Sequence, residues 1–301
     1  MAGLLLLCVL LATLSPHFLT WTNLINVLRQ ASLQFLLAAG LTLCILTAGI
    51  DLSVGAVLGL SACLAAALIA GGHLWWGMLA ALAVGAACGL VSGAMVAYAR
   101  LPAFIATYGM LWIAHGLAYV FMKGQVIHGF PRSFRFIGAG FVGGIPMPIL
   151  VALLVLAALH GMLHHTPLGP AIYAIGGNPR AARLPGMPVQ RYLTVVYALS
   201  GLLAAFAGLV VIARVNAADS GTGEDLLLPA IAAVVLGGTS LFGGYGGIAG
   251  TAIGSVILAL VVNGMNLLGV KTFWQAFVMG AIVILSVLAD HLAIGKVTRA
   301  A

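Results

Sequence analysis

Long apolar runs, separated by short polar or glycine- and proline-containing breaks, occupy almost the entire chain. Most of these runs are long enough to cross a membrane, and a backbone in lipid must satisfy its own hydrogen bonds, so we interpret them as helices. The expected helices are Leu4–Leu14, Leu33–Thr47, Val54–Ala70, Leu74–Tyr98, Phe104–Met122, Ile149–Leu163, Leu193–Ala213, Ala230–Leu236, Ile248–Leu268 and Phe273–Ala289. The pattern predicts an all-α, polytopic membrane bundle in which residues 1–301 form a single transmembrane domain.

The composition supports a protein that lies in a lipid bilayer. Hydrophobic residues make up 63% of the 301 residues and charged residues only 6%, whereas soluble domains carry about 25% charged residues. At roughly 20 residues per membrane helix, this apolar content is enough for about eight to ten spans. It excludes a soluble enzyme and a disordered protein. The net charge of +7 is scattered between apolar runs, so it does not form the basic stripe of a nucleic-acid-binding protein.

Two breaks fall at membrane depth rather than in loops. The first is 48–55, with the sequence Ala-Gly-Ile-Asp-Leu-Ser-Val-Gly, and the second is the glycine-rich segment 237–247. Each follows an apolar run and precedes one rich in small residues, which is the pattern of an internal repeat and points to a transport pathway. The residues that we assign to the helix breaks or translocation path are Asp51, Ser53, Gly237, Gly238, Thr239 and Ser240.

Asp51 is the only acidic residue well inside the apolar regions before Asp290. An ionisable residue at membrane depth points to function. The alternative is structural, since Asp51 or Ser53 can cap the helix that begins near Val54. Both interpretations place Asp51 at a helix break that faces the protein interior rather than lipid, with the Ser53 hydroxyl and the amides of Gly49 and Gly55 as partners.

Two asparagines, Asn263 and Asn266, lie three residues apart and therefore face the same side of one helix. Together with Trp274 and Gln275 they suit a neutral, hydroxylated solute. We assign the two asparagines to the translocation path. Hydrogen bonding between helices is the competing interpretation, and the residues favour it slightly.

Small residues recur every four positions, as at Gly85, Gly89 and Gly93 and at Gly246, Gly250 and Gly254. Such ladders let helix backbones approach closely. They fit either a dimer face or packing within one chain, and we expect packing within the chain.

No residue pattern indicates an enzyme, a cofactor or a metal site. Gly264, Gly269, Lys271 and Thr272 resemble a phosphate-binding loop, but one extra residue precedes the lysine and no strand precedes the loop. Neither Ser61 with His115 nor the pair His164-His165 offers the neighbours that a catalytic or metal site needs. We therefore expect any ATP hydrolysis to come from another chain.

The order of several segments resembles the membrane permease of bacterial ABC importers of the ribose, arabinose and xylose type. The segments are 23–30, 40–55 (with Gly-Ile-Asp-Leu-Ser-Val-Gly at 49–55), 174–178, 181–186, 230–241 and 263–270. The resemblance covers about Asn23 to Asp290. It implies two permease copies around the pore, an ATPase with tandem nucleotide-binding domains on the cytoplasmic side, and a periplasmic sugar-binding protein. It also places the chain in the bacterial inner membrane. The resemblance further implies which loops face the cytoplasm, an orientation that counting basic residues in the loops leaves undecided.

The same resemblance implies a cytoplasmic coupling segment in the stretch 166–191, which contains arginines and no acid. We expect a short amphipathic helix that starts at Asn178 or Pro179 and is ended or kinked by Pro185. Its expected apolar residues are Ala181, Ala182, Leu184 and Met187. The residues assigned to ATPase coupling are Gly176, Gly177, Asn178, Arg180, Arg183 and Gly186.

Two features separate this chain from many relatives. A polar N-terminal tail is nearly absent, and Leu227-Leu228-Pro229 stands where many relatives carry Glu-Leu-Asp or Glu-Leu-Asn. The transported sugar is therefore left open. The rival function is an ion-coupled secondary transporter, which usually needs several buried carboxylates; this chain offers Asp51 and little else.

Overall fold

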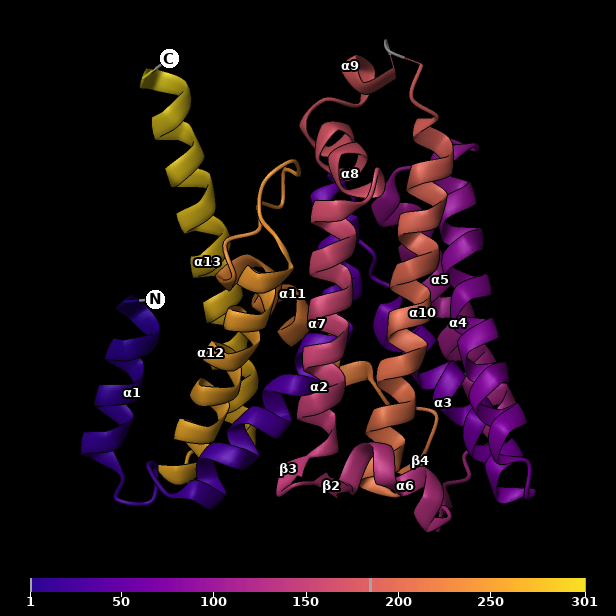
Figure 1. Cartoon of the computed structure of the whole chain (residues 1–301), viewed down its shortest axis with the longest axis vertical. Helices are drawn as coiled ribbons and strands as arrows, with labels where there is room; N and C mark the ends of the chain where they lie inside the picture. Colours follow the sequence, from indigo (N-terminus) through magenta and orange to yellow (C-terminus); the bar gives the residue numbers. More distant parts are fainter. Residues whose placement is uncertain (1, 184–185, 301) are drawn as a thin grey trace.

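Helices form most of the computed structural model, which describes residues 2–183 and 186–300 (Figure 1). The expected all-α membrane bundle is confirmed. The longer helices are α1 (Ala2–Leu14), α2 (Trp21–Leu46), α3 (Val54–Ala70), α4 (Leu74–Ala97), α5 (Ala103–Met122), α7 (Met147–His165), α10 (Val189–Val215), α11 (Leu227–Leu236), α12 (Ile248–Leu267) and α13 (Thr272–Ala300).

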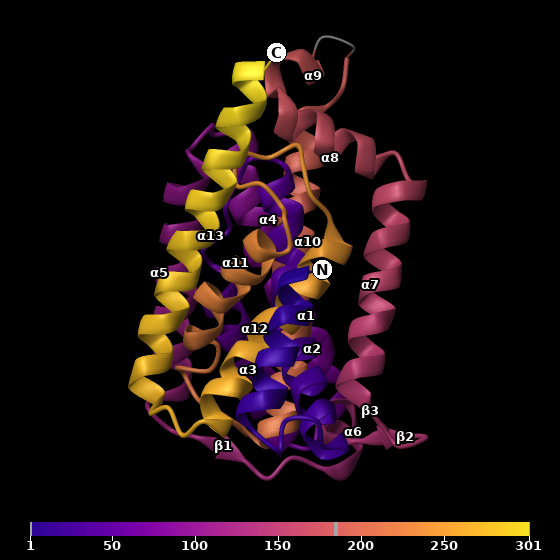
Figure 2. The same cartoon turned by 90° about the vertical axis from the view of Figure 1, so that its left-hand side faces the viewer.

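Shorter elements gather at the two ends of the bundle (Figures 1 and 2). One end carries α8 (Leu168–Gly177) and α9 (Pro179–Arg183). The other carries α6 (Arg132–Ala139) and two antiparallel pairs of two-residue strands. These pairs are β1 (Ile127–His128) with β4 (Ala217–Ala218) and β2 (Phe141–Val142) with β3 (Ile145–Pro146). A 3-10 turn, η1 (Glu224–Leu226), leads into α11.

Six of the described helices are long and apolar enough to cross a membrane: α2, α4, α5, α7, α10 and α12. α3 and the described apolar part of α13, Phe273–Leu285, are shorter apolar helices. The chain is therefore a multi-pass membrane protein.

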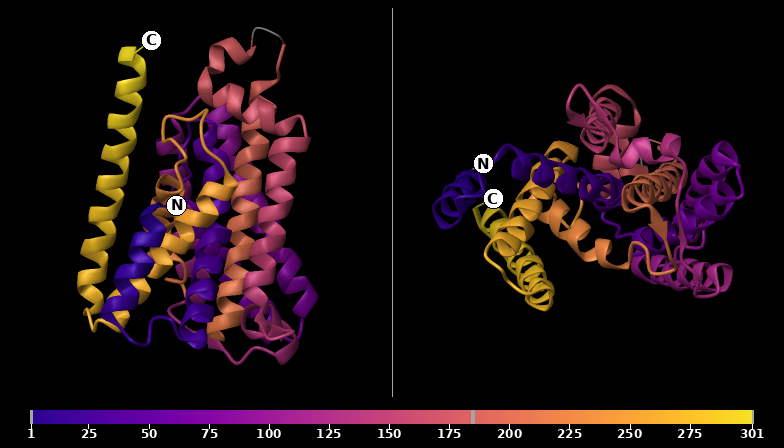
Figure 3. Two further views of the ribbon diagram at one scale, coloured as in Figure 1. Left: turned by 60° about the vertical axis from the view of Figure 1, so that its left-hand side comes forward. Right: turned by 90° about the horizontal axis from the view of Figure 1, so that it is seen from below.

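α2 and α10 form the centre of the bundle. In the most apolar stretch of α2, 83% of the residues are buried, and in that of α10, 67%, against 28% in α5 and 22% in α7. α4 and α3 pack on α10, while α12 and α11 pack on α2. Viewed along the bundle, α11 lies between α5 and α13 at one side of the molecule (Figure 3, right).

Several helix ends differ from the sequence prediction, and α13 runs to Ala300 rather than Ala289. Two further differences involve segments that are only partly apolar. α2 begins at Trp21 rather than Leu33, because Asn23 to Gln30 contains no helix breaker and its polar side chains find partners on neighbouring elements or remain exposed. The polar stretch 123–148, which lies between two expected helices, contains α6 and the β2–β3 pair. The apolar-run criterion misses both, since neither segment is uniformly hydrophobic.

The first glycine ladder packs within the chain, as expected. Gly85 lies against Gly201, Gly89 against the main chain of Tyr197, and Gly93 against Thr194, so the backbones of α4 and α10 touch. A Cβ at any of the three would collide with the main chain of α10. This close approach makes α4 and α10 the most extensively packed pair of helices in the described structure.

We predict that Gly89→Ala destabilises the protein by about 1–3 kcal/mol, the usual effect of overpacking a core. Gly161→Ala is the matched control, because a Cβ there meets no atom within 4 Å. Thermal unfolding in detergent measures the difference. Equal melting temperatures for the two variants would show that the α4–α10 contact is not close-packed.

Candidate functional site

Asp51 lies in the first helix break and points into the protein. Its side chain is 1% exposed. Oδ1 accepts hydrogen bonds from the Ser53 amide (3.0 Å) and the Ser53 hydroxyl (2.6 Å), and Oδ2 accepts one from the Ser200 hydroxyl of α10 (2.8 Å). A buried carboxylate needs such donors, since burial without them is very unfavourable. The expected interior position of Asp51 is confirmed.

The expected helix cap is not formed. The Ser53 hydroxyl donates to Asp51 instead of accepting an amide of α3. The Asp51–Ser53 contact is an Asx turn, in which a carboxylate binds the amide two residues on and shapes the entry to the helix. The Gly49 amide, expected as a free donor, binds the Cys44 carbonyl (3.1 Å). Ser200, distant in sequence, takes the place of the missing partner.

Two further side chains border the first break. The Thr107 hydroxyl of α5 donates to the Ile50 carbonyl (3.0 Å), which ties this helix to the break. The Tyr197 hydroxyl of α10 points toward Gly49, where a Cβ would collide with it. Tyr197 is fully buried, and its hydroxyl has no hydrogen-bond partner among the described residues.

The second break, between α11 and α12, is a loop closed by its own polar groups. The Thr239 hydroxyl accepts from the Gly247 amide (3.2 Å), and the Ser240 amide donates to the Tyr245 carbonyl (3.1 Å). Gly238 has φ +80°, a left-handed conformation that favours glycine. The expected interruption of the helix is therefore present, and Thr239 and Ser240 are both buried.

The second glycine ladder holds this loop against its own helices. Gly250 of α12 lies against Gly237, and Gly254 lies against Ala233 of α11. Gly246 lies against Thr239 within the loop. This ladder also packs within the chain.

The two breaks are in direct contact. Leu46 is the last residue of α2, and its carbonyl accepts a hydrogen bond from the Gly244 amide (3.0 Å). Gly243 lies against Ala48 in the first break, leaving no space for a Cβ. The Leu46 carbonyl freed by the first interruption is thus satisfied by an amide of the second.

α8 packs on the same junction. A Cβ at Gly176 would collide with the Leu46 carbonyl and the Gly244 amide. The Tyr173 hydroxyl donates to the Gly246 carbonyl (2.9 Å). The end of α8 therefore touches both helix breaks at one point.

A short helix is present at the expected place as α9, but it is only five residues long. It starts as expected: the Asn178 side chain accepts from the amides of Arg180 (3.0 Å) and Ala181 (3.1 Å). Ala182 is buried, whereas Ala181 is exposed, contrary to the expected apolar face. Arg180 and Arg183 are also exposed.

Other parts of the coupling assignment fall elsewhere. Gly176 and Gly177 end α8 instead of forming a loop, because the apolar residues before them continue the helix to Gly177. Leu184 and Pro185 lie outside the described residues. Gly186 follows them with φ +83°.

Comparison with known proteins identifies the family. The model of the family described as "Branched-chain amino acid transport system / permease component" matches residues 23–287. The chain belongs to this permease family. It is 45% identical to the ribose import permease RbsC of Escherichia coli K12 over 96% of this chain and 92% of that protein. The ribose import permease of Bacillus subtilis 168 is 42% identical over 96% and 91% of the two chains.

The D-allose transport system permease AlsC of Escherichia coli K12 is 38% identical over 93% of this chain and 87% of that protein. No solved structure matches the chain. The expected ABC importer permease is thus supported over the ion-coupled transporter.

In this permease, Asn263 and Asn266 form contacts between helices. Asn263 and Asn23 of α2 exchange two amide hydrogen bonds of 2.7 and 3.0 Å. Gln275 of α13 donates to Asn266 (2.7 Å). The structure does not bring either asparagine to the Asp51 cluster, and their assignment to the solute path stays a prediction.

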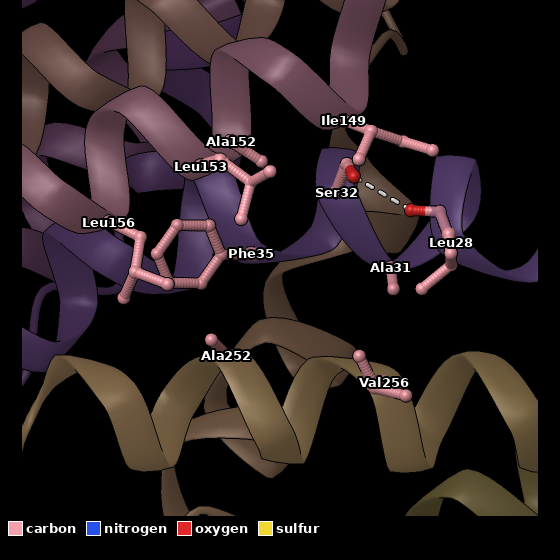
Figure 4. A pocket seen from close by; sticks show the side chains of 10 residues that line it. All are labelled: Leu28, Ala31, Ser32, Phe35, Ile149, Ala152, Leu153, Leu156, Ala252 and Val256. Atoms are coloured by element: carbon pink, nitrogen blue, oxygen red, sulfur yellow. Dashed lines mark hydrogen bonds between the residues drawn. The ribbon is translucent and has the colours of Figure 1, made fainter. Parts of the chain in front are cut away.

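An apolar pocket of about 110 Å³ lies between α2, α7 and α12 of the permease (Figure 4). The only polar side chain drawn there, Ser32, donates to the Leu28 carbonyl of its own helix (2.7 Å). Phe35, Leu156 and Val256 are among the other lining residues. The pocket thus offers a hydroxylated solute little more than the acceptor lone pairs of the Ser32 hydroxyl. Among the described residues, no three His, Cys, Asp or Glu side chains form a cluster that would hold a metal ion.

Sequence reasoning missed Ser200, Tyr173 and the carbonyl of Leu46. Serines are frequent in membrane helices, where they often bond their own helix, so nothing in the sequence separates Ser200 from the others. The Leu46 carbonyl is available because the helix ends there, which the break at Ala48 does signal.

We predict that Asp51→Asn preserves the fold and Asp51→Leu does not. Asparagine keeps an acceptor for Ser53, and its amide can donate to the Ser200 hydroxyl. Leucine leaves the Ser53 and Ser200 donors without an acceptor, and each buried donor without a partner costs about 1–3 kcal/mol. Thermal stability in detergent and solute uptake are measured for both variants, with Asp225→Leu, an exposed acid, as control.

Normal stability of the leucine variant would contradict this account of the cluster. Poor transport by a stable asparagine variant would show that the charge itself, beyond its hydrogen bonds, is used in transport.

Proposed function

We propose that the chain is the permease subunit of an ATP-driven importer that carries a monosaccharide across the bacterial inner membrane. The observation that carries this proposal is the 45% identity to a ribose import permease over 96% of the chain. The match to a D-allose permease extends the support to hexoses. D-ribose is the first solute to test.

The charge distribution supports partner chains at both ends of the bundle. Exposed Arg180 and Arg183 lie at the α8–α9 end, where an ATPase with tandem nucleotide-binding domains would dock. Arg132 is exposed on α6 at the opposite end, where a periplasmic sugar-binding protein would deliver the solute. A second permease copy would complete the pathway.

The contact of α8 with both helix breaks supports a route for coupling. Movement of α9 by the ATPase would shift α8, because the two helices are joined through Asn178. Gly176 and Tyr173 would transmit that shift to the loop 237–247 and to the end of α2. Asp51 would extend it to α10 through Ser200. A cavity of about 470 Å³ beside Tyr173 and the loop leaves room for the movement.

Uptake by the assembled importer tests the function. Proteoliposomes that contain the permease, the ATPase and the binding protein are expected to accumulate D-ribose only with ATP, while the purified permease alone hydrolyses none. Uptake by the permease alone, driven by a proton or sodium gradient, would overturn the proposal in favour of an ion-coupled transporter.

Glycine substitutions test the coupling route. We predict that Gly176→Ala raises the number of ATP molecules hydrolysed per sugar imported, because a Cβ there forces α8 away from Leu46 and Gly244. Gly161→Ala in α7 is the control, since a Cβ at Gly161 meets no atom within 4 Å. The ratio of ATPase activity to uptake is measured for both. An unchanged ratio in the Gly176 variant would contradict this route.

A further inference from the structure

A row of aromatic rings runs along the outer face of α5. Phe104, Tyr108, Trp112, His115 and Tyr119 follow one another at steps of three or four residues, and each ring contacts the next, with centroids 4.7–6.2 Å apart. Such steps keep all five rings on one side of the helix. A row of this kind is common on a helix that faces lipid, so the rings alone do not indicate a site.

A half-exposed charge in the middle of this row is incompatible with lipid. Glu224 of η1 lies 3.2 Å from His115 Nδ1, and its side chain is 49% exposed. His115 lies well inside α5. The segment before Glu224 runs along α3, where Cys63 Sγ donates to the Asp219 carbonyl (3.2 Å) and Gly223 lies against Gly55. Glu224 is therefore at membrane depth.

Ionisable side chains at this depth face a water-filled path or another protein surface, because exposure to hydrocarbon is very unfavourable. The outer face of α5 around Glu224 is thus not a lipid-facing surface. α11, which follows Glu224 directly, lies on the side of the bundle between α5 and α13 (Figure 3, right), where a second permease copy would enclose it.

A cavity of about 240 Å³ opens at this position, between α3, α5 and the start of α11. Trp112, His115 and Glu224 contribute its aromatic and polar wall, and Gly55 and Ala56 contribute the floor next to the first helix break. Ligand pockets typically span about 300–1,000 Å³ for drug-sized molecules, so this one suits a smaller ligand such as a single sugar ring. It offers more hydrogen-bonding groups than the apolar pocket between α2, α7 and α12.

We propose that this cavity binds the monosaccharide during its passage, an inference that rests on the proposed function. The exposed indole of Trp112 offers an apolar plane for the C–H face of the ring. The Glu224 carboxylate accepts hydrogen bonds from sugar hydroxyls, and the His115 imidazole binds a neighbouring hydroxyl. A few polar groups that fix orientation against an aromatic surface are typical of small-molecule sites. Because the carboxylate is half exposed, binding is weak and the solute is released readily.

Transport by paired variants tests the site in proteoliposomes that contain the complete importer. Glu224→Gln and Trp112→Leu are each expected to lower uptake at sub-saturating sugar by about tenfold, the effect of losing a hydrogen bond to a charged group or a comparable contact. The controls are Asp225→Asn and Trp75→Leu, which alter an adjacent exposed acid and an exposed tryptophan outside the cavity. ATPase activity stimulated by the binding protein is measured alongside, to show that each variant assembles.

Labelling gives a readout that does not depend on transport. Leu111→Cys places a thiol on the cavity wall, in a background where the four native cysteines are replaced by serine. D-ribose is expected to slow its reaction with a water-soluble maleimide, and the added Glu224→Gln change to abolish that protection.

Equal uptake by the Glu224, Trp112 and control variants, or labelling unaffected by the sugar, overturns the site while leaving the importer function intact. Failure of the unsubstituted importer to take up any monosaccharide overturns the proposed function instead.

Discussion

A backbone amide or carbonyl released where a buried helix is interrupted must find a new partner in the protein, and this constraint joins the two helix breaks of the permease. α2 ends at Leu46, and its free carbonyl accepts the Gly244 amide from a loop about 200 residues later. Two interruptions that would each be unfavourable alone are stabilised by meeting. α8 contacts that meeting point through Gly176, so a segment at one end of the bundle also touches the least regular part of the core.

Close approach of backbones is the second requirement, and small residues meet it. The glycines of α4 let α10 approach until main chains touch, and those of α12 do the same for α11 and the loop before it. Without a strong hydrophobic force between helices in lipid, such van der Waals contact and interhelical hydrogen bonds hold the bundle together. The reciprocal amide pair between Asn23 and Asn263 contributes the second kind of contact.

The sequence predicted the features that depend on local pattern. Apolar runs located most helices, glycine-rich segments located both breaks, and the isolation of Asp51 in apolar sequence placed it in the interior. The features it missed depend on contacts between distant segments. Ser200 is one serine among many until folding brings it to Asp51. Gly176 was assigned to coupling by resemblance, and its close approach to Leu46 and Gly244 appears only in the folded chain. His115 and Glu224 lie more than 100 residues apart, and no spacing rule joins them.

The unpaired hydroxyl of Tyr197 has a consequence for the populations of the transport states. A buried hydroxyl without a partner costs about 1–3 kcal/mol relative to one that is bonded. Any arrangement of α2 and α10 that brings a protein partner to this oxygen recovers that free energy. Among the described residues, the packing of α10 against the first break leaves this one hydrogen bond unmade. A gap of this size is what a docked protein or nucleotide can reverse by binding one state more tightly than the other. One phenolic oxygen beside Gly49 thus favours any conformation that gives it a hydrogen-bond partner.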